Sequence, residues 1–467
     1  MLKSIVFIIV VSLFCTTTLA QNYFYQKSFG TVNTELSRSI KLGADSAIYM
    51  VGYTNNTVNT DFNITISKLN YAGNVLWTKQ LGDANYNAAL YINTTNDGNF
   101  IICGENEPSA SNKDAFVLKI DTAGNVIWQN DIALPNNQSL KYCEQTSSGA
   151  IIACGATNDS AGYNDSWVVK LTSNGTLIWA KSYGTTANEY GQQIKETPSG
   201  NYVLMGDVRN VNTNNSYDFE LFKLDTAGTI IWDKTYGDDL QNGSQGVLIT
   251  STNNYLTYGE SEVTLNSPFN FWIDLVNPQG DTLWHKLIGG AYADAVFSAT
   301  EVSDGFVFTG YSSSYNNGTA TDIVVFKTDT LGNMLWYSTY GTAGIDIGYE
   351  IIKGLHNDFF VTGKYNAQAD DNYLLHVNNN GTLLTASNSI TKNNSANPFP
   401  NPSTGVFYFN DDVLSVSVYN TLGQLVHTQN NIRSTAVNLS QLNNGIYTIK
   451  IMNTNNVVIN YLISLDK

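Results

Sequence analysis

The chain has 467 residues, with 23 Lys and Arg against 39 Asp and Glu, which gives a net charge of −16. This balance argues against a nucleic-acid-binding protein, because no excess of cations is available to displace the counterions of phosphate groups. Charged residues make up only 13% of the chain, while 28 Tyr, 20 Phe and 37 Gly against 8 Pro indicate a β-rich protein with many turns.

Residues 1–20 are predicted to form a secretory signal peptide. Lys3 supplies the basic start, residues 5–14 form a short apolar run, and small residues precede a cleavage site between Ala20 and Gln21. The run is shorter than the roughly 20 apolar residues that a membrane-spanning helix needs. No later segment is apolar enough to cross a bilayer, so we expect an exported chain without a transmembrane segment.

Three cysteines follow the predicted cleavage site, Cys103, Cys143 and Cys154. An odd number leaves at least one thiol unpaired within a monomer. We interpret all three as small buried hydrophobic residues, since free cysteine packs well in protein cores. Their spacing does not match a metal site, and we expect neither a metal nor a cofactor.

A unit of about 52 residues repeats seven times along the chain. Each unit has an anchor glycine, and in the first six units a tryptophan stands four residues later, where the seventh has Thr385. A second glycine, further upstream, ends an apolar run. The anchor glycines are Gly73, Gly124, Gly175, Gly228, Gly280, Gly332 and Gly381; the tryptophans are Trp77, Trp128, Trp179, Trp232, Trp284 and Trp336; the upstream glycines are Gly52, Gly104, Gly155, Gly206, Gly259, Gly310 and Gly363.

Each unit is typical of four short strands. In the second unit they are predicted at residues 89–95, 100–103, 114–121 and 125–132, with turn residues between them. A single four-stranded sheet cannot cover both of its faces, whereas radial stacking buries each sheet against its neighbours. The sequence therefore predicts an all-β fold, a seven-bladed β-propeller over residues 21–386, with an open solenoid as the alternative.

The N-terminus favours a closed ring over the solenoid. Residues 25–30 align with residues 77–82 of the first unit, so the chain opens with an extra fourth strand. The last unit has a poor fourth strand, which lacks the tryptophan. We therefore predict that the N-terminal strand completes the last blade, beside residues 371–377, and leaves no free sheet edge.

The repeated residues are interpreted as structural. One tryptophan per blade at a fixed position is typical of a wedge packed between adjacent sheets. A lysine five residues before five of the anchor glycines suits a salt bridge, or an aliphatic stem that covers apolar surface with its amine in water. An Asp or Asn ten residues before each anchor glycine is predicted to accept backbone hydrogen bonds rather than to bind a metal; this set is Asn63, Asp114, Asp165, Asp218, Asn270, Asp322 and Asp371.

Residues 114–121, with the sequence Asp-Ala-Phe-Val-Leu-Lys-Ile-Asp, and the pair Tyr183-Gly184 resemble a bacterial β-propeller repeat family. The resemblance covers residues 23–386. Members of that family are modules of secreted or surface proteins, so the resemblance implies a fold rather than an activity.

The C-terminal part has a different pattern. Residues 387–397 are polar and irregular and are predicted to be a linker. Beyond them, residues 398–467 contain three stretches that alternate apolar and polar residues, at 416–426, 439–451 and 457–465. This pattern predicts a small β-sandwich.

The same C-terminal residues closely resemble the type A C-terminal sorting domain of type IX secretion, known from Bacteroidota. The resemblance implies that the type IX machinery is a partner and that the protein reaches the cell surface or the medium. It also implies that the tail is removed or linked to surface lipopolysaccharide after transport. The matching motif residues are Pro400, Asn401, Pro402, Gly405, Tyr419, Gly423, Gly445, Tyr447 and Lys467.

No catalytic residues are assigned from the sequence. The four histidines share no spacing, and only Arg38 and Arg209 lie in the predicted propeller, where a sialidase would need three arginines. We predict a monomeric, non-enzymatic binding module for a glycan or protein ligand. Two alternatives stay open, a structural component of the cell surface or gliding apparatus and a polysaccharide-active enzyme. The enzyme would use carboxylates predicted to lie in loops, such as Glu260, Glu262, Asp238, Asp239 and Asp294.

Overall fold

The computed structural model contains two compact units, Met1–Thr385 and Ala386–Lys467. Every regular element within the described residues is a β-strand, with no helix among them. The predicted signal peptide, its cleavage site, the linker, and Pro400, Asn401, Pro402, Gly423 and Lys467 of the sorting motif lie outside the described residues. The described residues are 24–30, 35–55, 62–82, 85–109, 112–158, 161–209, 216–237, 240–316, 318, 320–366, 370–383, 398, 403–420, 424–453 and 458–466.

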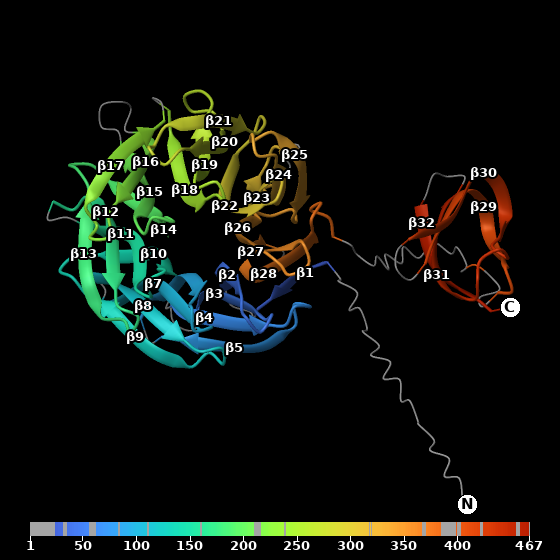
Figure 1. Ribbon diagram of the computed structural model, residues 1–467, viewed down its shortest axis with the longest axis horizontal. Helices are drawn as coiled ribbons and strands as arrows, with labels where there is room; N and C mark the ends of the chain where they lie inside the picture. The colour runs from blue at the N-terminus through green and yellow to red at the C-terminus, as the bar shows by residue number, and fades with distance from the viewer. Residues whose placement is uncertain are drawn as a thin grey trace, which may run out of the picture. The chain divides into compact units, whose positions relative to one another are not determined.

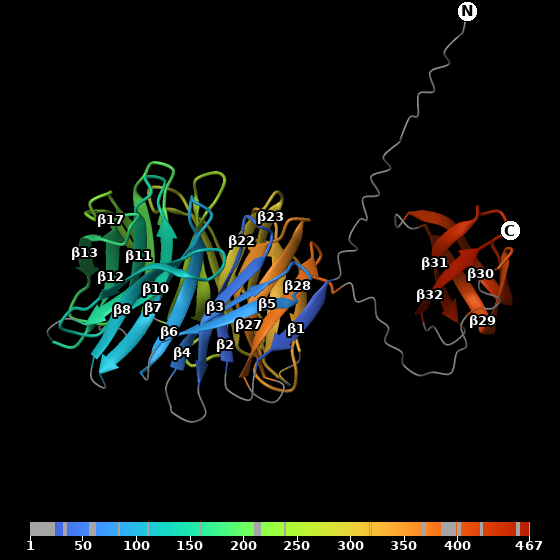
Figure 2. The same cartoon turned by 90° about the horizontal axis from the view of Figure 1, so that it is seen from below.

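The described strands of the first unit form seven antiparallel sheets of four, arranged as a ring (Figure 1). The first strand of each repeat lies nearest the centre of the ring, and the fourth lies at its outer edge. Figure 2 shows the strands crossing the ring from one face to the other.

The strand bounds of the first four sheets, each from the centre outward, are β2 (Glu35–Leu42), β3 (Ile48–Asn55), β4 (Phe62–Leu69) and β5 (Val75–Leu81); β6 (Asn87–Thr94), β7 (Phe100–Ser109), β8 (Asn112–Ile120) and β9 (Val126–Ile132); β10 (Gln138–Gln145), β11 (Ile151–Asn158), β12 (Asn164–Leu171) and β13 (Leu177–Tyr183); β14 (Glu189–Glu196), β15 (Tyr202–Arg209), β16 (Tyr217–Leu224) and β17 (Ile230–Tyr236). The other three sheets are β18 (Asn242–Ile249), β19 (Tyr255–Glu262), β20 (Phe269–Val276) and β21 (Thr282–Ile288); β22 (Asp294–Val302), β23 (Gly305–Ser312), β24 (Asp322–Thr328) and β25 (Met334–Tyr340); β26 (Ile347–Lys353), β27 (Asp358–Asn366), β28 (Asp370–Asn378) and β1 (Tyr25–Phe29).

The N-terminal strand closes the ring as the sequence predicts. Strand β1 pairs antiparallel with β28, from Tyr25 opposite His376 to Phe29 opposite Asn372. It thereby supplies the fourth strand of the sheet whose other strands come from the end of the repeat region. Tyr25 also donates a hydrogen bond of 3.0 Å to the carbonyl oxygen of Tyr71 in the first sheet, so the strand joins two neighbouring sheets.

Neighbouring sheets interlock through an aromatic ring and a glycine. Each repeated tryptophan is half-buried on an outermost strand. In five of the six, the ring lies so close to the anchor glycine of the next sheet that a β-carbon there would collide with it. These glycines turn the chain with a positive φ, so both the space and the backbone favour glycine. The pairs are Trp77–Gly124, Trp128–Gly175, Trp179–Gly228, Trp284–Gly332 and Trp336–Gly381.

Two boundaries depart from that pattern. At Gly280 the nearest side chain is that of Lys234 rather than Trp232. At Gly73, the boundary where the ring closes, the ring of Tyr25 takes the place of a tryptophan. Tyr25 occupies in β1 the position that Trp77 occupies in β5, so the closing strand reproduces the wedge as well as the pairing.

Every innermost strand carries a β-bulge at the same place. In β2, for example, Ser37 lies opposite Gly52 and Ser39 lies opposite Val51, so Arg38 is an extra residue. A β-carbon on Gly52 would overlap the carbonyl oxygen of Leu36, which explains why this position must be glycine. The same register shift opposite the upstream glycine recurs in all seven innermost strands. The extra residues are Arg38, Leu90, Lys141, Gln192, Gln245, Phe297 and Tyr349.

The described part of the C-terminal unit is one four-stranded antiparallel sheet, in the order β30 (Leu425–Asn438), β29 (Val406–Tyr419), β31 (Gly445–Asn453) and β32 (Val458–Leu465). Its core includes the buried Phe407, Val416 and Ile449. Of the motif residues, Tyr419 ends β29 and Gly445 begins β31. The predicted two-sheet sandwich stays a prediction.

Replacing an upstream glycine should destabilise the ring. Gly104→Ala places a β-carbon against the carbonyl oxygen of Ala88, and we expect a loss of about 2–3 kcal/mol in the free energy of unfolding. Gly98→Ala is the matched control, because no heavy atom lies within 4 Å of a β-carbon there although its φ is +78°. The control should cost about 1 kcal/mol. Equal losses in urea unfolding curves would contradict the close approach.

Closure by β1 predicts a second effect. Tyr25→Ala removes the wedge against Gly73 and the hydrogen bond to Tyr71, so we expect a loss of about 3 kcal/mol. Ser28→Ala, on the same strand but exposed, should change the free energy of unfolding by less than about 0.5 kcal/mol. If both variants unfold like the wild type, Tyr25 does not stabilise the seam, the boundary at which β1 closes the ring against the first sheet.

Candidate functional site

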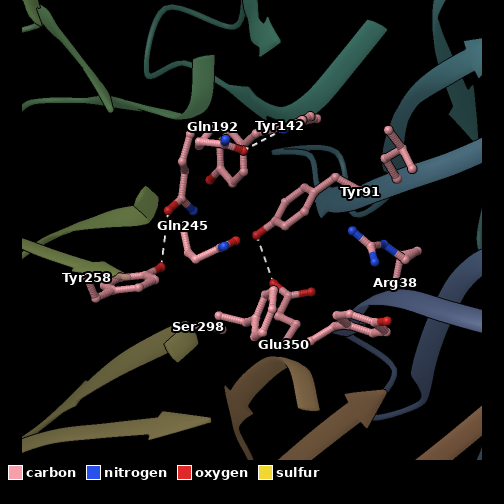
Figure 3. Close-up of a pocket in the computed structure, with 13 residues that line it drawn as sticks. Arg38, Tyr91, Tyr142, Gln192, Gln245, Tyr258, Ser298 and Glu350 are labelled. Carbon is pink, nitrogen blue, oxygen red and sulfur yellow. Dashed lines mark hydrogen bonds between the residues drawn. The ribbon is translucent and has the colours of Figure 1, made fainter. Parts of the chain in front are cut away.

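A cavity of about 180 Å³ lies on the axis of the ring (Figure 3). Side chains from the innermost strands of all seven sheets line it, and the seven bulge residues are all among them. A bulge adds one residue to a strand and redirects its side chain. Because the bulge recurs in every sheet, the seven extra side chains meet around one space.

This site was not predicted from the sequence, although a signal for it exists. The bulge residues stand 13 or 14 residues before the upstream glycines, at the same phase of every repeat. They differ in chemical type from one repeat to the next, so a search for repeated residues passes over them. The glycines opposite them are the signal that could have located the site.

The bulge residues form a rim with two different halves. On one half, the guanidinium of Arg38 lies 4.2 Å from the ring centroid of Tyr349, and the rings of Tyr349 and Phe297 meet edge to face at 5.7 Å. On the other half, Lys141 donates a hydrogen bond of 2.8 Å to Oε1 of Gln192. The rim therefore combines an aromatic and guanidinium side with an amine and amide side.

The charge of Lys141 is only partly compensated. Burial lowers the pKa of Lys141, the carboxylate of Asp207 opposes that shift, and Arg38 adds to it. Asp207 itself accepts hydrogen bonds from the Ser244 amide at 2.6 Å and from the Gln192 side chain at 2.7 Å. Gln192 thus links the amine to the carboxylate behind it.

A second cavity of about 220 Å³ continues along the axis and shares Tyr91, Gln193, Tyr258, Ser298 and Glu350 with the first. Lys41 and Lys195 line it. These two lysines lie further along the innermost strands β2 and β14, beyond the bulges.

Glu350 is fully engaged at the junction of the two cavities. It forms an ion pair with Lys41 and accepts hydrogen bonds from the Ser39 hydroxyl at 2.6 Å, the Ile40 amide at 2.7 Å and the Tyr91 hydroxyl at 2.8 Å. Burial lowers the pKa of Lys41, and Glu350 opposes that shift. This carboxylate therefore serves structure and charge balance, with its oxygens already bonded.

A matching pair lies on the opposite side of the axis. Glu144 and Lys195 approach within 3.3 Å. Glu144 also accepts hydrogen bonds from Tyr142 at 2.9 Å and from the amide of Glu196 at 2.6 Å. The rings of Tyr91 and Tyr142 lie 4.3 Å apart and connect the two ion pairs. Each of these two carboxylates is thus paired with a lysine, and Lys353 at the end of β26 also lines the second cavity.

The carboxylates predicted to lie in loops are placed differently by the structure. Glu260 and Glu262 belong to β19 and Asp294 begins β22, so the loop assignment was wrong for these three. Asp294 is fully buried and accepts a hydrogen bond of 2.7 Å from Ser314. Asp238 and Asp239 lie outside the described residues. Continuous pairing in β19 explains the error, because strand residues beyond an upstream glycine can still be polar.

Two carboxyl groups, Glu220 on β16 and Glu260 on β19, have raised pKa values. Burial and the charges of Glu189, Asp233 and Asp207 raise the pKa of Glu220 to about 8. Burial and Asp207 raise the pKa of Glu260 to about 7, against a hydrogen bond from Tyr311.

The histidines in the ring lie away from the axial cavity. His376 contacts Asp358 at 2.5 Å, both side chains are buried, and Tyr71 donates to the same carboxylate at 2.7 Å. This cluster lies beside β1 and supports ring closure. His285 contacts the buried Asp274 at 2.6 Å on the outer part of its sheet.

The repeated lysines and the cysteines have structural positions. Lys68, Lys119 and Lys327 each form an ion pair of 2.7 Å with an aspartate in a turn of the same sheet. The three cysteines are buried and unbridged, as predicted. Within the described ranges, no three His, Cys, Asp or Glu side chains are grouped to hold a metal ion.

Comparison with known families identifies the C-terminal part. Residues 397–464 match the family described as the secretion system C-terminal sorting domain. This chain therefore ends in a type IX sorting domain, which indicates export to the cell surface or secretion. Comparison with curated protein sequences gives no match.

Several solved structures are similar to the ring at low sequence identity. A polysaccharide lyase shares 11% identity, with a TM-score of 0.48 and coverage of 77% of this chain and 93% of that chain. The β-propeller domain of the Trilobed protease from Pyrococcus furiosus shares 9% identity, with a TM-score of 0.44 and coverage of 76% of this chain and 98% of that chain. The extracellular domain of a one-component system from B. thetaiotaomicron shares 11% identity, with a TM-score of 0.43 and coverage of 95% of this chain and 57% of that chain. This chain thus spans less than two thirds of the last structure, and none of these likenesses carries an argument about activity.

A search for membrane-spanning helices gives none: no helix in the described part of the chain is long and apolar enough to cross a bilayer.

The raised pKa values of Glu220 and Glu260 predict how stability depends on pH. A carboxyl group with a raised folded-state pKa stabilises the fold below its unfolded pKa, and this contribution is lost as pH rises through the folded value. We expect the free energy of unfolding to fall by about 2 kcal/mol or more between pH 5 and pH 8.5. The double variant E220Q/E260Q should lose much less over that range.

The matched control is Glu107→Gln, which removes a carboxylate with 32% of its side chain exposed. Urea unfolding at several pH values should give this control the wild-type slope. If the double variant also keeps the wild-type slope, the two carboxyl groups are not the source of the pH dependence.

Proposed function

We propose that the exported part of this chain is a monomeric, seven-bladed β-propeller that binds a glycan or a protein ligand in its axial cavity and catalyses no reaction there. The propeller spans residues 21–386, and a linker at 387–397 joins it to a sandwich-like sorting domain at 398–467. The type IX secretion machinery recognises that domain. After transport, the propeller meets its ligand at the cell surface or in the medium.

The observation that carries this proposal is the convergence of one side chain from each of seven sheets on a single cavity. A closed set of rigid strands holds these side chains, so the site is formed before a ligand arrives. Concave sites with aromatic walls and a few directed polar groups are the usual form of a small-molecule site. Phe297 and Tyr349 supply the aromatic wall here, and Arg38, Lys141 and Gln245 supply polar groups.

The chemistry of the cavity favours binding over catalysis. General acid–base catalysis needs a positioned group that is free to exchange a proton. Among the described residues that line the cavity of Figure 3, Glu350 is the only carboxylate and no histidine is present. The oxygens of Glu350 already bond to Lys41, Ser39, Ile40 and Tyr91.

One observation favours the enzymatic alternative. The pKa of Glu260 is raised to about 7, which is the range of an effective general acid. Glu260 lies on a second strand and does not line the axial cavity. We therefore keep a polysaccharide-active enzyme as the second candidate and include Glu260 in the test.

Binding without turnover is tested with the purified full chain on immobilised glycans and proteins. We expect at least one ligand to be retained and to keep its mass after prolonged incubation. Phe297→Ala and Tyr349→Ala should each weaken its binding about tenfold or more. Leu76→Ala, on the outer strand β5 with 55% of its surface exposed, is the control that should bind like the wild type.

Two results would count against this proposal. Cleavage of the ligand by the wild type but not by Glu260→Gln would support the enzyme instead. Equal binding by the wild type and both aromatic variants would place the ligand outside the axial cavity.

A further inference from the structure

The rim of the axial cavity has cationic groups with unused hydrogen-bonding capacity. No hydrogen bond or ion pair joins Arg38 to another described residue, and its contact with the ring of Tyr349 leaves the edge of the guanidinium available. Lys141 donates one hydrogen bond to a neutral amide and forms no ion pair among the described residues. Two cations thus face a space in a chain whose net charge is −16.

The charges deeper in the channel do not neutralise these two groups. Lys41 is paired with Glu350, and Lys195 with Glu144. Asp207 is the carboxylate that acts most strongly on the pKa of Lys141, and its oxygens accept hydrogen bonds from Ser244 and Gln192. The rim therefore carries a local positive charge that the nearby carboxylates, Asp207 and Glu105, offset only in part.

The kinds of side chain on the rim specify the ligand further. A guanidinium presents a planar pair of N–H donors that matches a carboxylate, and its stacking on Tyr349 fixes that plane. Gln245 forms no hydrogen bond with other described residues, so its amide can bond to hydroxyl groups. Phe297 and Tyr349 offer flat apolar surfaces of the kind on which the C–H face of a sugar ring packs.

The size of the cavity sets a limit on the ligand. A volume of about 180 Å³ is smaller than the roughly 300 Å³ at which pockets for drug-sized molecules begin. The first cavity therefore accommodates one sugar ring, and an attached chain extends through the opening or into the second cavity of about 220 Å³ that continues along the axis. A terminal or branch unit of a polysaccharide meets this condition.

We propose that the rim binds the carboxylate of an acidic sugar, a uronate unit of a polysaccharide. Arg38 and Lys141 hold the carboxylate, the amides of Gln192 and Gln245 bond to the hydroxyl groups, and Phe297 and Tyr349 cover the apolar face of the ring. This inference rests on the proposed function, since it names the ligand class for the same cavity.

The test uses the full chain in calorimetric titrations with glucuronate and galacturonate and their short oligomers. Glucose and galactose are the uncharged matches, and sulfate and a short acidic peptide represent other anions. We expect the uronates to bind about tenfold or more tightly than the uncharged sugars and to weaken as salt is added. Arg38→Gln should lower uronate affinity about tenfold or more, and Arg38→Lys should restore part of it.

Arg209→Gln is the matched control, because it removes the same charge from the end of β15, outside the cavity lining. It should bind uronates like the wild type, and the thermal unfolding midpoint of Arg38→Gln should match that of the wild type. Equal losses in Arg38→Gln and Arg209→Gln would overturn the assignment of the site.

The remaining outcomes separate this inference from the proposed function. If uncharged sugars bind as well as uronates and Arg38→Gln leaves both unchanged, the acidic-sugar inference is wrong while the axial binding site stands. If sulfate or the acidic peptide binds and no uronate does, the site takes another anion and the sugar assignment fails. If none of these binds, and the ligands found by screening bind Phe297→Ala and Tyr349→Ala as tightly as the wild type, the proposed function fails as well.

Discussion

The close approach of the first strand to the second within each sheet is the constraint on which the site depends. Opposite each upstream glycine, the carbonyl oxygen of the first strand occupies the space of a missing β-carbon, as Leu36 does at Gly52. That approach permits the bulge, and the bulge directs an extra side chain to the axis. Since the constraint recurs in seven sheets, the cavity is a property of the fold, while its chemistry comes from seven side chains whose type the repeat does not specify.

Ring closure is the second condition for the site, because the cavity exists only if all seven sheets surround it. At six of the seven boundaries, neighbouring sheets contact each other through an aromatic ring against a turn glycine, and this contact needs a sheet on either side of the boundary. At the seam, Tyr25 supplies the ring from the N-terminal strand, and the buried group of His376, Asp358 and Tyr71 lies beside it. A short strand therefore maintains a site to which it contributes no side chain.

The strands, the turns and the pairing of β1 with β28 could be predicted because glycine, tryptophan and alternating apolar residues repeat at a fixed spacing. The axial site could not be predicted in the same way. A bulge interrupts the alternation of buried and exposed residues at a single point, as where Tyr142 and Cys143 are both buried after Lys141 in β10, and in strands of seven to nine residues this is too short a change to be recognised from the sequence. The residues that it exposes, from Leu90 to Lys141 and Phe297, share no property that a repeat search can detect. The polar ends of strands such as β19 misled the placement of Glu260, because polarity alone does not separate a strand end from a loop.

The bulges also separate the requirements of folding from those of recognition. An amino acid at Gln245 or Leu90 can be exchanged without changing the core, the wedges or the seam, because the side chain lines the axial cavity rather than packing between sheets. Duplicated copies of such a gene can accordingly diverge in what they capture through single codon changes at seven positions. The scaffold is thus a natural template for combinatorial libraries, in which those seven codons are randomised and the remainder is kept.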